Sequence, residues 1–254
     1  MGKNGGGVLV TGASRGIGGE IALELASRGL SVGCISRRGV APPVPSDSRA
    51  NSPCGVWGRL VPYSCDVADR KRVSAVVDAF AEEAGGLRAV VNCAGIHSES
   101  ESATLTKAAF RRIFDINVLG ALTVCQSALV HFTKSGHGLI VNIGSFYDRL
   151  GVNRSLAYCA SKAALASLTR TLAVEWASAG VAAVTLAPGY VRTDLNAAFF
   201  DDPRKLAAIE SRIPLHRTGA AQEIARLAAA LIVEDVPFLT GTTIYVDGAQ
   251  GVSL

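Results

Sequence analysis

The stretch Val8-Leu9-Val10-Thr11-Gly12-Ala13-Ser14-Arg15-Gly16-Ile17-Gly18 decides the fold. A short apolar run leads into a glycine-rich turn, and apolar residues then recur at helical spacing, at Ile17, Ile21 and Leu25. The pattern predicts a strand, a tight turn and a helix, which is the context that a dinucleotide-binding turn requires. Glycines permit a positive φ and close backbone approach, and the helix N-terminus offers free N–H groups to a pyrophosphate. The alternative is an ordinary strand–helix turn that binds no ligand.

Strand-like and helix-like segments alternate along the rest of the chain. Strands are expected near 8–11, 31–35, 59–65, 88–92, 138–144, 181–187 and 242–246, and helices near 16–28, 69–84, 106–133 (with a break), 155–178 and 220–233. This alternation predicts the α/β class, with a Rossmann-type, doubly wound parallel sheet and helices on both faces. At 254 residues, the chain is expected to form one domain, residues 1–254.

Two segments depart from this alternation. Residues 39–58 contain four prolines and no helical period, so an irregular loop is expected where a crossover helix is usual. Residues 194–215 contain a short amphipathic stretch between prolines and aspartates. This second segment predicts a lid over a substrate, with an ordinary surface excursion as the alternative.

The residues after the second expected strand bear on the choice of cofactor. In a dinucleotide fold, this strand end meets the adenosine ribose, where an acidic residue selects NAD. The chain has Ser36, Arg37 and Arg38 there instead. Guanidinium forks bind phosphate well, and Arg15 could approach the same phosphate from the glycine turn. The sequence therefore predicts NADP(H) rather than NAD(H), with solvated loop arginines as the alternative.

Tyr158 and Lys162 are four residues apart in an expected helix, so they share one helix face. An ammonium group beside a phenol favours the phenolate and lowers the tyrosine pKa. A tyrosine that exchanges protons near neutrality needs a shift of roughly 3 units from its usual pKa of about 10. Lys162 and a cationic cofactor ring together are a plausible source of that shift. Taken alone, the pair also fits a solvated helix face.

Composition excludes several classes of protein. A net charge of +4 with no Lys/Arg block does not suit nucleic-acid binding. The six cysteines are scattered without a C-x-x-C pair, which favours free thiols in a reducing compartment. The four histidines have no metal-ligand spacing, so no metal is expected. With no signal-peptide pattern and no apolar run of transmembrane length, a cytoplasmic protein that binds no membrane is expected.

The assembled motifs resemble the short-chain dehydrogenase/reductase family over nearly the whole chain. They occur in the family's order: Thr11-Gly12-Ala13-Ser14-Arg15-Gly16-Ile17-Gly18, Cys65-Asp66-Val67, Asn92-Cys93-Ala94-Gly95, Asn117 within Phe114-Asp115-Ile116-Asn117-Val118, Ser145, Tyr158 with Lys162, Pro188-Gly189, and Leu239-Thr240-Gly241 with Val246-Asp247-Gly248. Two positions depart from the usual pattern, Cys93 and Ala249. Eight ordered motifs are far more specific than any one of them.

The resemblance implies NADPH-dependent reduction of a carbonyl to a secondary alcohol. Tyr158 would donate the proton, and Lys162 would lower the tyrosine pKa and hold the nicotinamide ribose. Ser145 would hydrogen-bond the carbonyl oxygen as charge develops, and Asn117 would hold a water for proton relay.

The resemblance also implies which residues bind the cofactor and which form the substrate pocket. The cofactor-binding residues would be Gly12, Ser14, Arg15, Gly16, Ile17, Gly18, Ser36, Arg37, Arg38, Asp66, Val67, Asn92, Ala94, Gly95, Tyr158, Lys162, Pro188, Gly189, Val191 and Thr193. The substrate pocket would be walled by His97, Phe146, Tyr147 and Tyr190.

The substrate stays open at this level. Ile213-Pro214-Leu215 with Arg217 and Gly219 is similar to the 3-oxoacyl-carrier-protein reductases, which suggests a 3-oxoacyl thioester or a related ketone. Gly136 and Ala179 stand where that subgroup has carrier-binding arginines, which weakens carrier docking. The alternatives are a polyol, sugar or steroid alcohol dehydrogenase and, in another class, a non-catalytic cofactor-binding sensor.

The resemblance implies an assembly as well. Relatives pair the helices that correspond to 116–132 and 155–178 across a two-fold axis, and these helices carry much apolar surface here. A homotetramer, or else a dimer, is expected.

Overall fold

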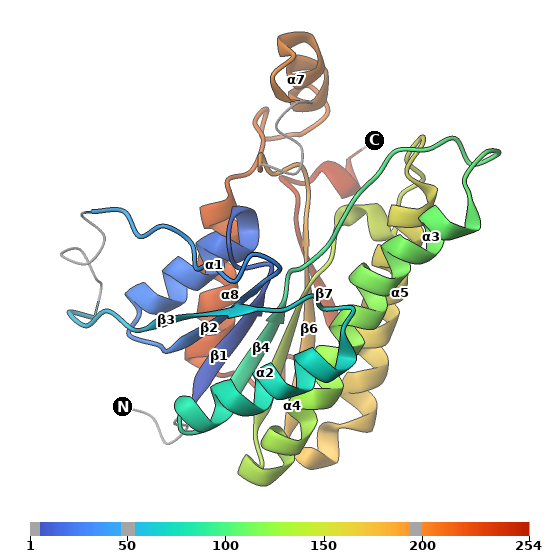
Figure 1. Ribbon diagram of the computed structural model, residues 1–254. Coiled ribbons are helices and arrows are strands. Elements are labelled where there is room, and N and C mark those ends of the chain that lie inside the picture. The colour runs from blue at the N-terminus through green and yellow to red at the C-terminus, as the bar shows by residue number, and fades with distance from the viewer. Residues whose placement is uncertain (1–5, 47–53, 194–199, 254) are drawn as a thin grey trace.

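A seven-stranded parallel sheet forms the centre of the molecule, as the computed structural model shows for residues 6–46, 54–193 and 200–253 (Figure 1). The strands lie in the order β3-β2-β1-β4-β5-β6-β7. They are β1 (Gly7–Thr11), β2 (Val32–Ser36), β3 (Leu60–Ser64), β4 (Leu87–Asn92), β5 (Gly138–Ile143), β6 (Val181–Pro188) and β7 (Thr242–Val246). The predicted α/β class and doubly wound sheet are confirmed. The strand order reverses between β1 and β4, where such sheets bind their ligands.

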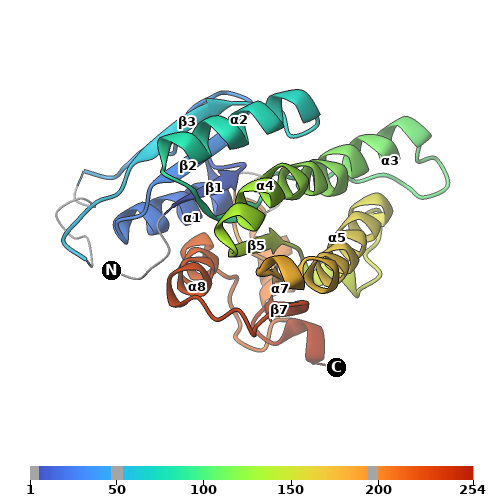
Figure 2. The ribbon, with the colours of Figure 1, turned by 90° about the horizontal axis from the view of Figure 1, so that it is seen from below.

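Helices cover both faces of the sheet (Figure 2). One face carries α1 (Gly16–Ser27) and α8 (Ala221–Glu234), and the other carries α2 (Arg70–Glu83), α4 (Ala121–Ser135) and α5 (Leu156–Glu175). Strand residues alternate between these layers, because successive side chains of a strand point to opposite faces. In β1, Val8 and Val10 pack with α1 and α8, whereas Leu9 packs on the opposite side.

The connection between β2 and β3 contains no helix or strand in its described parts, 37–46 and 54–59. It nevertheless packs on α1, since Ala41 and Trp57 join the core on that face and the Gly58 amide donates to the Ala26 carbonyl at 2.7 Å. The proline-rich loop therefore takes the place of a crossover helix beside α1. Residues 47–53 lie outside the described residues.

The helix expected at 106–133 is continuous but changes its winding. It consists of α3 (Lys107–Phe114), a π-helical segment (Asp115–Gly120) and α4. The whole stretch, Lys107–Ser135, is long and apolar enough to cross a membrane by length and composition alone, which corrects the expectation of no such run. Its apolar side includes Val124, Ala128 and Phe132, which are fully buried in the core beside the sheet. It is therefore packed as a core helix.

The segment predicted to form a lid contains one helix, α7 (Pro203–Glu210), while 194–199 lie outside the described residues. Figure 1 shows α7 apart from the layers around the sheet, beyond the carboxyl ends of the strands. Phe200, Ile209 and Ile213 form a small buried cluster of their own, against which Tyr190 packs. The segment is thus joined to the body of the protein through an aromatic residue that follows β6.

Candidate active site

The glycine turn joins β1 to α1 and sets the distance between two segments of backbone. Gly12 has φ +68°, and a Cβ there would lie 3.0 Å from the backbone nitrogen of Ala94. A Cβ at Gly18 would lie 2.5 Å from the Gly12 carbonyl oxygen. The Thr11 hydroxyl accepts hydrogen bonds from the amides of Cys93 and Ala94, both at 3.0 Å. The turn therefore fixes the N-terminus of α1 beside the end of β4, at the point where the strand order reverses.

A cavity of about 420 Å³ runs along the carboxyl edge of the sheet. Every residue that the sequence assigned to the cofactor lines it, except Asn92. Further lining residues adjoin those motifs in sequence and were missed: Ile35, Cys65, Cys93, Ile96, Ile116, Ile143 and Gly144. Apolar residues that flank a glycine motif were the available signal. Among the described residues, no group of three His, Cys, Asp or Glu side chains could hold a metal ion.

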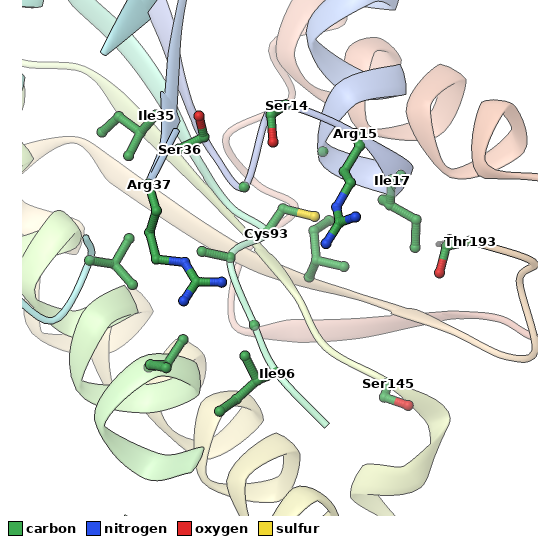
Figure 3. A pocket seen from close by; sticks show the side chains of 18 of the residues that line it. Ser14, Arg15, Ile17, Ile35, Ser36, Arg37, Cys93, Ile96, Ser145 and Thr193 are labelled. Carbon is green, nitrogen blue, oxygen red and sulfur yellow. The ribbon is translucent and has the colours of Figure 1, made fainter. Parts of the chain in front are cut away.

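The end of the cavity at β2 and β3 is rich in positive charge. Figure 3 shows the side chains of Arg15 and Arg37 directed into the cavity, and Arg38 also lines it. Within the part of the chain that the structure describes, Asp66 is the only carboxylate among the lining residues. It accepts a hydrogen bond from the Ala68 amide at 3.0 Å. Three guanidiniums against one carboxylate make this end suited to an anion such as a phosphate.

The opposite end, at β5 and β6, holds Ser145, Tyr158 and Lys162. Ser145 follows β5, and its hydroxyl accepts from the Tyr147 amide at 3.2 Å, which begins a short turn. Lys162 is buried in α5 and donates to the Ile143 carbonyl oxygen at 2.7 Å. Burial lowers the pKa of Lys162 to about 8. The helix and the strand thus hold a hydroxyl, a phenol and an amine around one end of the cavity.

The pKa of Tyr158 shifts in the direction opposite to the expectation. Burial raises it to about 12, and interaction with the Ser145 hydroxyl lowers it only in part. The Lys162 ammonium lies 5.6 Å from the centre of the tyrosine ring and is bonded to a backbone carbonyl. In the chain by itself, desolvation of the phenol therefore outweighs the nearby amine. The raised pKa keeps the Tyr158 phenol neutral.

Asn117 lies in the π-helical segment and does not line the cavity. Its side-chain oxygen accepts from the Ile96 amide at 2.8 Å, and its nitrogen donates to the Ile96 carbonyl at 3.0 Å and to the Ser161 hydroxyl at 3.1 Å. The side chain therefore joins the strand end after β4 to α5. These bonds use both hydrogens of the amide nitrogen and one lone pair of its oxygen.

Asn92 was expected to line the cleft, and the structure corrects this. Its side-chain nitrogen donates to the Asn142 oxygen at 2.9 Å, and Asn142 donates in turn to Thr169 of α5 at 2.8 Å. The Thr169 hydroxyl also meets that of Thr185 at 2.8 Å. Because Asn92, Asn142 and Thr185 are in register on β4, β5 and β6, they form a buried polar ladder across three strands. The ladder fastens α5 to the sheet two turns beyond Lys162.

Aromatic side chains gather around Tyr158, although none of the four expected pocket residues lines the cavity itself. The rings of His97 and Tyr147 contact that of Tyr158 edge to face, with centres 4.7 and 5.8 Å apart. Tyr190 contacts Tyr147 and also Phe200, a residue that the sequence did not single out. Burial lowers the pKa of His97, which favours a neutral imidazole. The cluster is aromatic and carries little charge.

Known proteins resemble this chain along almost its full length. A family model described as enoyl-(acyl carrier protein) reductase matches residues 12–251. The chain is 34% identical to 3beta-hydroxysteroid dehydrogenase 1 of Eggerthella lenta, covering 96% of this chain and 92% of the relative. It is 32% identical to 3-oxoacyl-[acyl-carrier-protein] reductase FabG of Escherichia coli, covering 95% of this chain and 96% of the relative.

A solved structure shares the fold. The structure of a gluconate 5-dehydrogenase from Burkholderia cenocepacia, in complex with NADP and tartrate, matches with a TM-score of 0.85. The two chains are 29% identical, and the match covers 99% of this chain and 97% of the other. With the ordered motifs and the sheet described above, these similarities have one reading: the chain belongs to the short-chain dehydrogenase/reductase family of oxidoreductases.

Proposed function

We propose that the protein is an NADPH-dependent oxidoreductase that reduces a ketone carbonyl to a secondary alcohol. One observation carries the proposal: a single cavity has three arginines at one end and Ser145, Tyr158 and Lys162 at the other. The first end suits a phosphate, and the second offers a hydroxyl and a phenol to one substrate oxygen. A dinucleotide that spans the carboxyl edge of the sheet would join the two.

The residues fit NADP(H) better than NAD(H). Ser36 ends β2, and Arg37 and Arg38 follow where an NAD-binding protein would have a carboxylate. The Ser36 hydroxyl lies 3.3 Å from the Val40 amide and shapes a tight loop around the two arginines. Arg15 and Arg37 would hold the 2′-phosphate, while the α1 N-terminus would face the pyrophosphate. When bound, NADPH supplies a hydride to the carbonyl carbon.

The chain's own residues control the carbonyl oxygen. Ser145 and Tyr158 would both donate hydrogen bonds to it, and these bonds strengthen as the oxygen gains negative charge. The Tyr158 hydroxyl then gives up its proton, so that the oxygen becomes an alcohol and the tyrosine a phenolate. Lys162 would stabilise that phenolate and hold the nicotinamide ribose. Its pKa of about 8 keeps a proton within reach for returning the tyrosine to its neutral form.

Three further assignments complete the proposed cofactor site. Asp66 and Val67 would meet the adenine, and Val191 and Thr193 would hold the carboxamide of the nicotinamide. Asn117 would support a water for proton relay through its backbone, since the π-helical winding changes the backbone hydrogen bonding around it. Crystals with bound NADPH test these three contacts.

The substrate class that we propose is a 3-oxoacyl thioester or a related ketone, not tied to a carrier protein. Gly136 and Ala179 precede β5 and β6 and therefore lie at the amino ends of those strands, on the edge of the sheet away from Ser145. His137 is paired with Asp235 at 2.7 Å. A polyol, sugar or steroid alcohol is the second candidate, favoured by the similarity to the steroid and gluconate dehydrogenases.

We also propose a homotetramer, or else a dimer, in the cytoplasm. Val130 of α4 and Val174 of α5 are 71% and 79% exposed, which leaves apolar surface on the outer sides of both helices. Burying such surface against a second copy is favourable. All six cysteines are free, as suits a reducing compartment. Light scattering tests the assembly, and a monomeric mass contradicts it.

The experiment for the activity is a carbonyl panel read by NADPH oxidation, with NADH in parallel. The panel contains acetoacetyl-CoA, cyclic ketones, steroid ketones and keto sugars. Turnover with NADPH that is lost in Tyr158→Phe supports the reductase. Binding of NADPH without turnover across the panel, in protein of native fold, contradicts it and supports a non-catalytic sensor.

A further inference from the structure

Two phenol hydroxyls meet beside the catalytic tyrosine. Tyr147 lies in the turn after β5, and Tyr190 follows β6. Their hydroxyl oxygens are 3.0 Å apart, and their rings are nearly perpendicular, at 87°. Tyr147 also contacts the Tyr158 ring at 84°. The two hydroxyls are therefore held by the same two strand ends that supply Ser145 and Gly189 to the cavity.

The pair has hydrogen-bonding capacity to spare. Each phenol carries one proton, and each oxygen can also accept. Only one proton is used in the bond between them, and neither hydroxyl has a further hydrogen-bond partner within residues 6–46, 54–193 and 200–253. Burial and the Tyr190 hydroxyl raise the pKa of Tyr147 well above its ordinary value, so that it stays protonated. The pair therefore presents a free O–H donor and acceptor lone pairs.

The walls around the pair favour flat, uncharged rings. Phe146 packs against both tyrosines, with ring centres 4.9 and 5.3 Å away, and Phe200 contacts Tyr190 at 6.5 Å. Phe146 and Phe200 are themselves buried, so the half-buried rings of Tyr147 and Tyr190 present the aromatic surface to a ligand. Such a surface binds apolar ring systems by burial and edge contacts.

The charged residues next to Tyr147 are engaged elsewhere. The Asp148 carboxylate accepts from the Tyr245 hydroxyl at 3.0 Å, and the Arg149 guanidinium lies 3.7 Å over the Tyr245 ring. Both are thus held toward β7. An open-chain polyol would find few polar partners among these walls, whereas a ring with a single polar group would match them.

We propose that the Tyr147–Tyr190 hydroxyl pair binds a second oxygen of the substrate, which is a fused-ring ketone carrying a hydroxyl or carbonyl group away from the reacting carbonyl. The proposal rests on the proposed function, because it needs the reacting carbonyl on Ser145 and Tyr158. Of the two substrate classes proposed above, it favours the ring ketones of the second over an open-chain 3-oxoacyl thioester. A site that hydrogen-bonds a substrate oxygen rejects an analogue without it, since the spare O–H of the pair would then be covered by the ligand without an acceptor. The pair thus selects the substrate without taking part in the chemistry.

The test compares 2-tetralone with its four hydroxy derivatives, the isomers that carry the hydroxyl at position 5, 6, 7 or 8. For each ketone, kcat/KM is measured with NADPH, and affinity for the protein with NADP⁺ present is measured by calorimetry. The wild type is compared with Tyr147→Phe, Tyr190→Phe and, as a matched control, Tyr63→Phe. The hydroxyl of Tyr63 bonds to Glu83 on the surface. The readout is the ratio of hydroxylated to parent ketone, which a general loss of activity leaves unchanged.

The wild type should prefer at least one isomer by about tenfold, the size of one hydrogen bond in a desolvated site. That ratio should fall toward one in Tyr147→Phe and Tyr190→Phe and persist in Tyr63→Phe. A preference seen in binding without reduction of any ketone supports the pair but contradicts the proposed reductase. If no isomer is preferred in turnover or binding, or if the preference survives both pocket variants, the proposal is overturned.

Discussion

The two ends of the cavity are built by different means. The end at β2 and β3 consists of a backbone turn and exposed arginines, among them Arg37 and Arg38. The end at β5 and β6 consists of buried side chains that bond to one another or to the backbone, such as Lys162 on the Ile143 carbonyl. The first end is specified by short local strings of sequence. The second exists only when several elements pack together, so mutations should act locally at one end and cooperatively at the other.

The largest effect is expected at the catalytic end. Tyr158→Phe removes the proton donor, and kcat should fall by about 10²–10⁴, the usual contribution of general acid catalysis. NADPH affinity, read by fluorescence titration, should change little, because the phosphate-binding end is untouched. An equal loss of affinity and rate would show that the two ends are not separable.

Titration of Lys162 gives the next effect. Because burial lowers its folded pKa to about 8 from 10.5, the unfolded chain binds more protons between these values. The buried lysine therefore destabilises the folded protein below pH 8. This destabilisation is lost as pH rises from 8 to 10.5, so the free energy of unfolding gains about 3 kcal/mol in all. Urea unfolding of wild type and Lys162→Met at several pH values isolates the contribution of the lysine. The buried cysteines titrate in both proteins, so their effect cancels in the difference. A difference that does not change with pH contradicts the assignment.

Replacing Arg37 and Arg38 tests the end of the cavity at β2 and β3. Arg37→Ala with Arg38→Ala removes charge-assisted hydrogen bonds, so the preference for NADPH over NADH should fall by about 10- to 100-fold. kcat with saturating NADPH should stay close to that of the wild type. Lys205→Ala, on the exposed side of α7, serves as the control for loss of positive charge. If the double variant still prefers NADPH over NADH, the two arginines are not the source of that preference.

The smallest effect is expected in the polar ladder beneath the catalytic end. Thr169→Val keeps the shape of the side chain but leaves Asn142 and Thr185 without their hydroxyl partner. The free energy of unfolding should fall by about 1–3 kcal/mol, the cost of unpaired buried polar groups. Ser167→Val on the more exposed side of α5 is the comparison. Equal losses in both variants would mean that the ladder adds nothing beyond helix propensity.

The same contrast explains how much of the fold the sequence could predict. Alternating strand and helix patterns were sufficient for the sheet. The absence of periodicity in 39–58 correctly predicted that the described parts of this segment, 39–46 and 54–58, contain no helix. The π-helical segment at Asp115–Gly120 was not predictable, since its composition does not differ from that of an α-helix. The membrane-length helix was missed because a break was expected where the winding only changes.

In the site, residues that belong to short sequence motifs were predicted correctly more often than residues whose place depends on contacts between distant segments. The glycine turn and the residues after β2 line the cavity as the motifs implied. Asn92 does not, because its partners Asn142 and Thr169 come from segments far away in the chain. The direction of the Tyr158 pKa also depends on burial, which a Tyr–Lys spacing does not report. Phe200 joins the aromatic cluster only through the fold of the 200–215 segment.

The central claim is that the two ends cooperate to pass a hydride to a ketone. The most direct measurement uses NADPH labelled with deuterium at C4, on each face in turn, with 2-tetralone and its hydroxy derivatives, followed by mass spectrometry of the alcohol. The account predicts deuterium at the carbinol carbon from one labelled face only, and incorporation that is about 10²–10⁴-fold slower in Tyr158→Phe. Binding of labelled NADPH with no deuterium in any product would contradict it.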